Sequence, residues 1–247
     1  MEIKCPSGIS GVVRGMKVKE LGDMADAKLI RSGKIVDRIV SNCWQKTTSI
    51  GPYSYAGDSL PWESMLQGDR AWAFMCIRSA TFGNDFTFEH VCSNETCKYK
   101  YEATIKLDSL VLKNLPQTSY SHVTNGTPLK TTIAGKKVKF RLLKCSDDQR
   151  LTTLTQQMQL SFPVAQLVCR IVEVEGILNS DIDELVAWVE DLELEAGLEL
   201  RQTMEDADCG VEMEIVTTCP NKTCGNVEKF DLPLGSGFFQ MRKTKKV

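Results

Sequence analysis

Cysteine is the residue type whose number and spacing indicate chemistry in this sequence, which has ten cysteines and two histidines among 247 residues. Four of the cysteines form two pairs, Cys92 with Cys97 and Cys219 with Cys224. Both pairs read Cys-x-Asn-x-Thr-Cys, so the sequence contains two copies of one motif. The remaining cysteines are isolated, as small apolar residues of a protein core are; they are Cys5, Cys43, Cys76, Cys145, Cys169 and Cys209.

Each cysteine pair lies between two extended-looking segments and is therefore predicted at the tip of a β-hairpin. The first hairpin is expected over residues 84–108 and the second over residues 210–234. Four thiolates from two such tips match the tetrahedral coordination of zinc, with Zn–S distances of about 2.3 Å. An all-thiolate site leaves no position for water or substrate, so the metal is expected to be structural. The predicted ligands of this Zn²⁺ are Cys92, Cys97, Cys219 and Cys224.

Other interpretations of the four cysteines remain open from the sequence. They are thiols without metal, two disulfides, or ligands of an iron–sulfur cluster, because tetrahedral sulfur ligation suits iron–sulfur as well as zinc. The first residues carry no apolar signal-peptide core, so we expect a reducing compartment, where disulfides are rare. His90 is an alternative ligand for one position, although it lies two residues before Cys92 and is expected to point along the strand.

The composition is that of an ordinary globular protein, with 42% apolar and 25% charged residues. The net charge of −2 gives no overall basic field, which disfavours nucleic acid as a partner. A membrane span needs about 18–20 apolar residues, and the best candidate, residues 71–80, is interrupted by Arg78. We therefore expect no membrane span.

The elements around the hairpins predict an α+β fold and a single domain over residues 1–247, with a mainly helical insertion at 146–208. Helical N-terminal and central segments would surround a zinc-ribbon-like pair of hairpins, which the metal would hold side by side. The expected elements are two helices within 17–47, a buried helix over 65–82, an exposed loop over 116–131, strands over 138–143 and 164–175, and helices from 146 to about 160 and over 180–206, the last with a break at Gly197. A short buried helix is the alternative for residues 164–175.

Two regions are candidate partner-binding surfaces. The outer face of the helix over 180–206 is strongly acidic, which indicates either a solvated surface or a docking surface for a basic partner. The C-terminal segment combines two phenylalanines with a basic tail, and these phenylalanines either pack back on the core or anchor a partner. The candidate partner-binding residues are Glu190, Asp191, Glu195, Phe238, Phe239, Arg242 and Lys243.

The sequence lacks the common catalytic motifs: there is no G-x-x-x-x-G-K-[ST], G-x-G-x-x-G, G-x-S-x-G or H-E-x-x-H. The two histidines, His90 and His122, have no nearby partner in sequence that would activate a nucleophile. We therefore expect a protein that is not an enzyme. An enzyme with an open metal site is the third alternative.

The order of these motifs resembles the baseplate hub protein family of T4-like contractile-tailed bacteriophages. The resemblance is carried by Cys5-Pro6-Ser7-Gly8, by Gly68-Asp69-Arg70, by Arg78 in the buried helix, by the two cysteine motifs and by the Phe-Phe ending. It implies a virion or assembly protein, made in the host cytoplasm, that oligomerises and contacts other hub or tail proteins, including the tape measure. The four residues within each cysteine pair depart from the two of the common zinc ribbon.

A zinc-ribbon protein that binds nucleic acid is the alternative function, because paired cysteines at hairpin tips also occur there. Such a protein needs a basic surface on the ribbon. Lysines flank both cysteine pairs, but acidic residues lie among them, so the sequence favours an assembly protein. The lysines are Lys98, Lys100, Lys222 and Lys229, and the acidic residues are Glu95, Glu102, Glu228 and Asp231.

Overall fold

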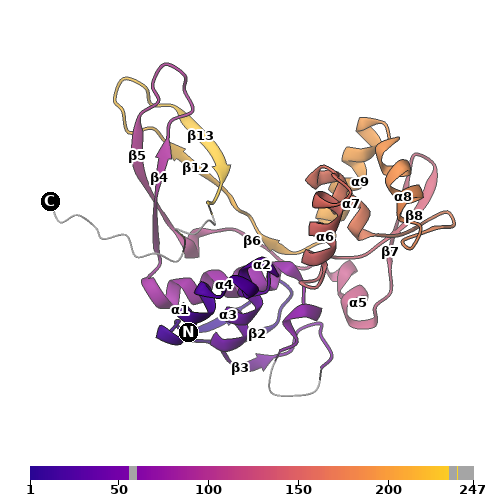
Figure 1. The fold of residues 1–247 in the computed structure, drawn as a ribbon, viewed down its shortest axis with the longest axis horizontal. Coiled ribbons are helices and arrows are strands. Elements are labelled where there is room, and N and C mark those ends of the chain that lie inside the picture. The colour runs from indigo at the N-terminus through magenta and orange to yellow at the C-terminus, as the bar shows by residue number, and fades with distance from the viewer. Residues whose placement is uncertain (56–59, 234–237, 239–247) are drawn as a thin grey trace.

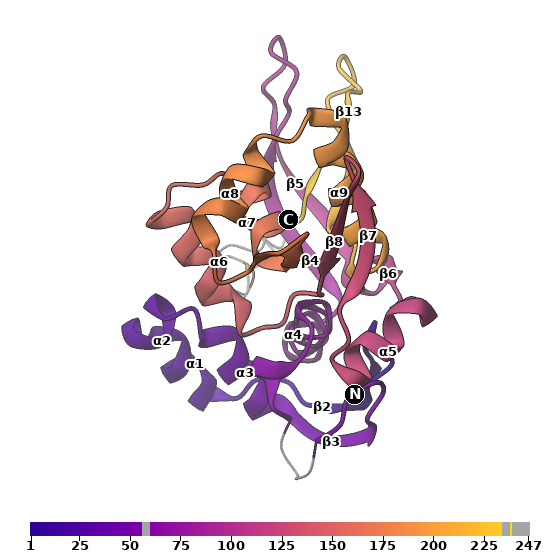
Figure 2. The ribbon, with the colours of Figure 1, turned by 90° about the vertical axis from the view of Figure 1, so that its right-hand side faces the viewer.

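A computed structural model describes residues 1–55, 60–233 and 238. It combines helices with small antiparallel sheets, which is the α+β class expected from the sequence. Figures 1 and 2 show three parts, which we call the N-terminal body (residues 1–82), the helical body (residues 129–206) and the hairpin arm (residues 85–106 and 214–231). The arm extends away from the N-terminal body.

The N-terminal body packs helices on a three-stranded antiparallel sheet of order β1-β2-β3. The strands are β1 (Glu2–Lys4), β2 (Ser10–Val13) and β3 (Trp44–Ser49). The helices are α1 (Val18–Ala25), α2 (Ala27–Arg31), α3 (Ile35–Cys43), the 3₁₀ helix η1 (Trp62–Ser64) and α4 (Gln67–Phe82). The two helical patterns predicted within 17–47 are present, but Asp26 caps a separate α2 and the chain becomes a strand at Trp44.

The buried helix predicted over residues 65–82 is confirmed as α4, which ends at Gly83. Gly83 has φ +89°, a conformation that glycine adopts without strain. Ala73 and Ile77 of this helix are completely buried. The N-terminal end of α4 lies against the chain at Cys209, where a Cβ on Gly68 would stand 2.3 Å from the Cys209 carbonyl oxygen. Only glycine therefore allows this close approach.

At this end of α4 the Cys5-Pro6-Ser7-Gly8 motif meets the Gly68-Asp69-Arg70 motif, although the two lie far apart in the sequence. The backbone N–H of Ser7 donates to Asp69 over 2.9 Å, and the hydroxyl of Tyr53 donates to the other carboxylate oxygen. Asp69 is completely buried, and burial raises the pKa of its carboxyl group despite these hydrogen bonds. The adjacent Arg70 forms an ion pair with Asp37 at 2.8 Å inside the N-terminal body, and a second with Asp148 at 2.7 Å that joins this body to the helical body.

The helical body contains a four-stranded antiparallel sheet of order β10-β9-β8-β7 and four helices. The strands are β7 (Leu129–Ile133), β8 (Lys136–Phe140), β9 (Ile171–Val174) and β10 (Ile177–Leu178), and the helices are α6 (Asp147–Gln156), α7 (Phe162–Arg170), α8 (Ile182–Glu190) and α9 (Leu194–Asp206). Val168, Ile171, Leu185 and Leu200 are completely buried in its core.

Two expectations for this region are wrong, those for residues 116–131 and for the break in the helix over 180–206. Residues 116–131 contain α5 (Gln117–Asn125) and the start of β7 where the sequence predicts a loop. Residues 164–175 take both of the forms considered for them, the helix α7 up to Arg170 and the strand β9 after it. Pro163 in the first turn of α7 favours a helix start over the β-propensity of the valines that follow. The helix over 180–206 breaks between Glu190 and Leu194, three residues or more before Gly197.

The loop prediction failed because the buried face of α5 is polar. Ser119 and His122 are both buried. The ring of His122 accepts a hydrogen bond from the Leu142 backbone N–H at Nε2 over 3.3 Å, while Nδ1 faces the Thr127 carbonyl. A helix whose buried face is polar has no apolar periodicity from which it could be predicted.

The hairpin arm consists of two two-stranded antiparallel sheets that lie side by side (Figure 1). The first hairpin is β4 (Asp85–Val91) with β5 (Lys100–Lys106), and the second is β12 (Glu214–Thr218) with β13 (Val227–Asp231). The 3₁₀ helix η2 (Leu107–Ser109) and the short pair β6 (Leu112–Lys113) with β11 (Gly210–Val211) form its foot. Buried aromatic and aliphatic side chains fill the arm, among them Phe86, Phe88 and Ile215.

Phe238 lies in this core and is 1% exposed. Of the two alternatives for this residue, the structure of this chain therefore has Phe238 packed on the core and not exposed as an anchor for a partner. Its ring centroid lies 5.0 Å from that of Phe86 and 6.1 Å from that of Phe74. Its carbonyl oxygen accepts a hydrogen bond from Arg78 Nε over 3.3 Å. Arg78, itself 4% exposed, also donates to the carbonyls of Gly83 and Asp85.

Replacing Phe238 by alanine should lower the free energy of unfolding by about 3–5 kcal/mol, because the substitution leaves a cavity among aromatic side chains. Urea denaturation measures this change. The control is Phe162→Ala, since the Phe162 ring is 57% exposed and its loss should cost less than about 1 kcal/mol. Equal effects of the two substitutions would contradict the burial of Phe238.

A second prediction concerns pH. Glu20 is completely buried, and the hydrogen bond from Arg14, opposed by burial and helped by the Lys17 backbone N–H, lowers its pKa from 4.5 to about 2. A lowered pKa stabilises the fold above pH 4.5, and this contribution is lost as the pH falls from 4.5 toward 2. Glu20→Gln should therefore be less stable than wild type near about pH 7, and the difference should shrink below about pH 4. A difference that grows in acid, measured by urea denaturation, would contradict this assignment.

Candidate metal centre

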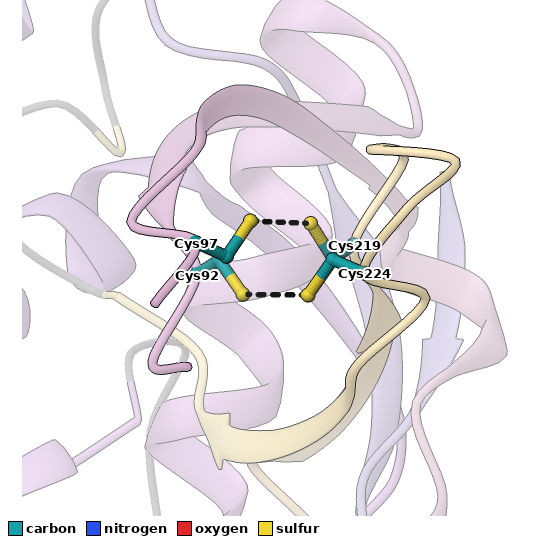
Figure 3. Close-up of side chains that lie close together, drawn as sticks. All are labelled: Cys92, Cys97, Cys219 and Cys224. Carbon is teal, nitrogen blue, oxygen red and sulfur yellow. Dashed lines mark hydrogen bonds between the residues drawn. The ribbon is translucent and has the colours of Figure 1, made fainter. Parts of the chain in front are cut away.

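The four paired cysteines converge at the tip of the hairpin arm (Figure 3). Their Sγ atoms all lie within 4.8 Å of one another. The Cys92 and Cys224 sulfurs are 3.8 Å apart, and those of Cys97 and Cys219 are 3.9 Å apart. Each of these contacts joins one hairpin to the other.

This donor set fits a tetrahedral zinc ion. Four sulfurs at Zn–S distances of about 2.3 Å stand about 3.8 Å from one another, which matches both close contacts between the hairpins. Cys92 and Cys219 are buried, while Cys97 and Cys224 are half-buried. The arrangement therefore offers four sulfur ligands in a closed site, with zinc and iron–sulfur as the matching chemistries.

The repeated asparagine and threonine close the same turn in both copies of the motif. In the first copy the Asn94 side-chain oxygen accepts hydrogen bonds from the backbone N–H and the hydroxyl of Thr96, over 3.0 and 2.8 Å. In the second copy Asn221 accepts the same two bonds from Thr223, over 3.2 and 2.9 Å. This is the Asx turn that asparagine favours, and it explains why both residue types recur.

The turn is completed by a residue in the left-handed region after each second cysteine. Lys98 has φ +44° and Gly225 has φ +58°, and their N–H groups donate to the carbonyls of Asn94 and Asn221 over 3.1 Å. Glycine adopts this conformation without steric cost, whereas lysine is strained there. The Lys98 ammonium group also donates to the Ser93 carbonyl over 3.3 Å, which helps to hold the strained residue.

Beneath the sulfurs, polar side chains pair across the space between the hairpins. Nε2 of His90 lies 3.2 Å from the Glu228 carboxylate, and the His90 ring stacks on Phe230 with centroids 4.1 Å apart. The hydroxyl groups of Tyr101 and Thr217 lie 2.8 Å apart. His90, the alternative ligand, thus contacts Glu228 and stands outside the group of four sulfurs found among the described residues.

Glu228 is buried, although the sequence predicted its charge to lie on the surface of the ribbon. It is 8% exposed and accepts a hydrogen bond from the Ser93 backbone N–H over 3.0 Å. Burial opposes its ionisation, but the bonds from His90 and Ser93 outweigh burial and lower its pKa to about 2. Alternation along β13 could have revealed this, because Phe230 and Leu232 point inward and Glu228 shares their face.

The sulfurs differ in their readiness to ionise. The backbone N–H of Tyr99, opposed by burial and helped by the Asn221 amide, lowers the pKa of Cys97, whereas burial raises the pKa of Cys92 and Cys219. Thiolates, not thiols, bind zinc, so the surroundings of Cys97 favour the form of its sulfur that binds a metal.

The other candidate residues lie away from the sulfurs. Glu190, Asp191 and Glu195 are exposed on α8, α9 and the segment between them, in the helical body. Phe238 is buried at the base of the arm, while Phe239, Arg242 and Lys243 lie outside the described residues. The structure therefore brings together the four cysteines but not the remaining candidates.

In a comparison with known protein families, residues 10–240 match the family described as T4 bacteriophage base plate protein. This protein belongs to the T4 bacteriophage base plate protein family. The match covers most of the chain and includes the N-terminal body from residue 10 onward, the helical body and the hairpin arm. No curated protein and no solved structure matches the chain.

Membership of the base plate family indicates a structural protein of the phage tail whose partners are other tail proteins. The resemblance drawn from the sequence motifs is confirmed at this level. Within the described part of this base plate protein, no helix has both the length and the apolar character that a membrane crossing requires.

The four-sulfur site can be tested by measuring the zinc content of the protein and by replacing single cysteines. Purified protein should contain about one zinc ion per chain, and Cys97→Ser or Cys224→Ser should lower both the zinc content and the melting temperature, because metal-binding free energy becomes folding free energy in such sites. Elemental analysis and thermal denaturation measure the two effects.

The control is Cys43→Ala, a buried cysteine far from the arm in sequence, which should keep its zinc even where its melting temperature falls. Less than about half a zinc ion per wild-type chain, or a melting temperature unchanged in both serine variants, would contradict a structural metal.

Proposed function

We propose that this protein is a non-enzymatic structural or assembly protein of the baseplate hub, in which a zinc ion staples the hairpin arm. The observation that carries the proposal is the family match over residues 10–240. In this proposal the chain forms one α+β domain over residues 1–247, with residues 146–208 as an insertion between the hairpins. It would be made in the host cytoplasm and then enter the tail.

The zinc proposal is supported by the convergence of four thiols whose spacing suits a tetrahedral ion. Cys92, Cys97, Cys219 and Cys224 would be its ligands. When bound, the ion supplies a structural cross-link and no position for a reacting group. A two-stranded hairpin alone is marginally stable, so a cross-link between two of them is physically useful.

A role without catalysis is supported by how the two histidines are engaged. His90 pairs with Glu228, and His122 contacts the Thr127 carbonyl and the Leu142 backbone N–H. Neither histidine is paired with a serine or cysteine nucleophile in the described structure, which is the arrangement that nucleophilic catalysis needs.

For partner contacts we propose the acidic surface of the helical body. Glu190, Asp191 and Glu195 are exposed there, and two large apolar side chains accompany them, Leu194 at 77% and Leu198 at 54% exposure. Acidic groups around exposed leucines suit a partner that presents basic residues around an apolar patch. Other hub or tail proteins, including the tape measure, are the proposed partners, with Phe239, Arg242 and Lys243 as further contacts.

The nucleic-acid alternative is not supported by the charges on the outer face of the arm. Lys229 pairs with Glu214 at 3.0 Å, and Lys106 lies opposite Asp85 in the strand register. A phosphate backbone needs several uncompensated basic groups on one surface, whereas each of these lysines has an acidic residue beside it.

A pull-down from infected cells tests the proposed assembly role. Wild-type protein should recover other baseplate proteins, and reversing the charges of Glu190, Asp191 and Glu195 to lysine should lower that recovery at least about tenfold, since each lost complementary contact weakens binding. Zinc content and melting temperature should not change.

The matched control reverses three exposed acidic residues of the arm and its foot, Glu95, Glu102 and Asp108, and should leave recovery intact. Recovery of no tail protein by the wild type would contradict the assembly role. Binding of random DNA at about 100 mM salt with a steep salt dependence would favour the nucleic-acid alternative instead.

A further inference from the structure

The two asparagines that close the cysteine turns also reach across to the opposite hairpin. The side-chain amide of Asn94 donates to the sulfur of Cys224 over 3.6 Å. The amide of Asn221 donates to the sulfur of Cys97 over 3.4 Å. Each copy of the motif therefore supplies a hydrogen bond to a sulfur that belongs to the other copy.

The direction of these amides is fixed by their surroundings. The side-chain oxygen and nitrogen of an asparagine are distinguished by the hydrogen bonds that they make. The oxygen of Asn94 faces two donors, the N–H and hydroxyl of Thr96, and the oxygen of Asn221 faces the same two donors of Thr223. The NH₂ group must then be the end that points at the sulfur.

A third amide adds to this pattern from the second hairpin. The side chain of Asn226 lies 3.9 Å from the Cys92 sulfur and 3.4 Å from the Ser93 hydroxyl. Cys92, Cys97 and Cys224 thus each receive an amide from the hairpin to which they do not belong. None of these amides could reach its sulfur if the hairpins were apart.

Such donors stabilise sulfur that carries negative charge as a metal ligand, because an N–H group places partial positive charge next to the sulfur. Four thiolates around one Zn²⁺ carry an excess negative charge of two, and groups behind the ligands commonly change metal affinity by about 10–100-fold. The amides should therefore matter most when all four sulfurs are ionised around a metal.

We propose that Asn94 and Asn221 are positioning residues of the metal site, whose crossed amides set its affinity for a divalent ion and couple metal binding to the pairing of the two hairpins. This inference rests on the zinc site of the proposed function. The asparagines do not touch the ion. They act through the sulfur atoms of Cys224 and Cys97.

The test measures the zinc dissociation constant by competition with a chromophoric chelator. Asn94→Ala and Asn221→Ala should each weaken zinc binding by about 10–100-fold, and by similar factors because their contacts are equivalent. Asn94→Asp should weaken it further, since a carboxylate puts negative charge beside a thiolate. In cobalt-substituted protein, the sulfur-to-metal charge-transfer bands should shift in all three variants.

The matched controls are Glu95→Gln and Lys222→Gln, exposed residues next to the two asparagines, which should bind zinc within about twofold of wild type. If Asn94→Ala does not fold, Thr96→Val tests the role of Asn94 instead. The Thr96 hydroxyl orients the Asn94 side chain, so its loss should weaken zinc binding, by a smaller factor than the loss of the amide.

The outcomes separate this inference from the proposed function. A wild-type chain that binds no zinc overturns the metal site itself. A wild-type chain that binds one zinc ion, with both alanine variants within about twofold in affinity and unshifted cobalt spectra, overturns the role of the asparagines and leaves the zinc site standing.

Discussion

The convergence of four sulfurs from two distant stretches of chain is the constraint on which the rest of the molecule depends. It fixes residues 92–97 against residues 219–224, so the helical body between them becomes a closed loop anchored at one site. Each doubling of the length of a flexible loop adds only about 0.6 kcal/mol to its closure cost. The long segment between the hairpins is therefore compatible with their contact at the tip, and this segment has its own core of buried aliphatic residues.

The arm is stabilised at both ends, and its two ends use different interactions. At the tip, sulfurs and amides join the hairpins. At the base, the Phe238 ring packs on Phe86, and Arg78 holds three backbone carbonyls while lying over aromatic rings. Between these ends His90 and Glu228 pair across the interior. Two small sheets, each too small to be stable alone, can form a stiff projection when both ends are fixed.

The sequence allowed the hairpins, α4 and the group of four cysteines to be predicted, because each depends on local pattern: strand alternation, apolar spacing and a repeated motif. Prediction from the sequence failed where the buried side chains are polar. Nothing in the composition of α5 marks Ser119 and His122 as buried, and Glu228 looked like a surface charge. Contacts between distant residues were also beyond prediction. The ion pairs of Arg70 with Asp37 and Asp148, and the crossing of Asn94 to Cys224, exist only because the fold brings separate segments together.

The separation of the two cysteine turns along the chain also has a consequence for the order of biosynthesis. The first turn leaves the ribosome well before the second, and the delay is roughly 6 to 24 seconds at synthesis rates of about 5–20 residues per second. During that interval the nascent chain presents one hairpin with two thiols and without its partner. The helical body has time to fold first, since its contacts lie within the intervening residues. The two cysteine turns can therefore meet only after the chain between them has been made.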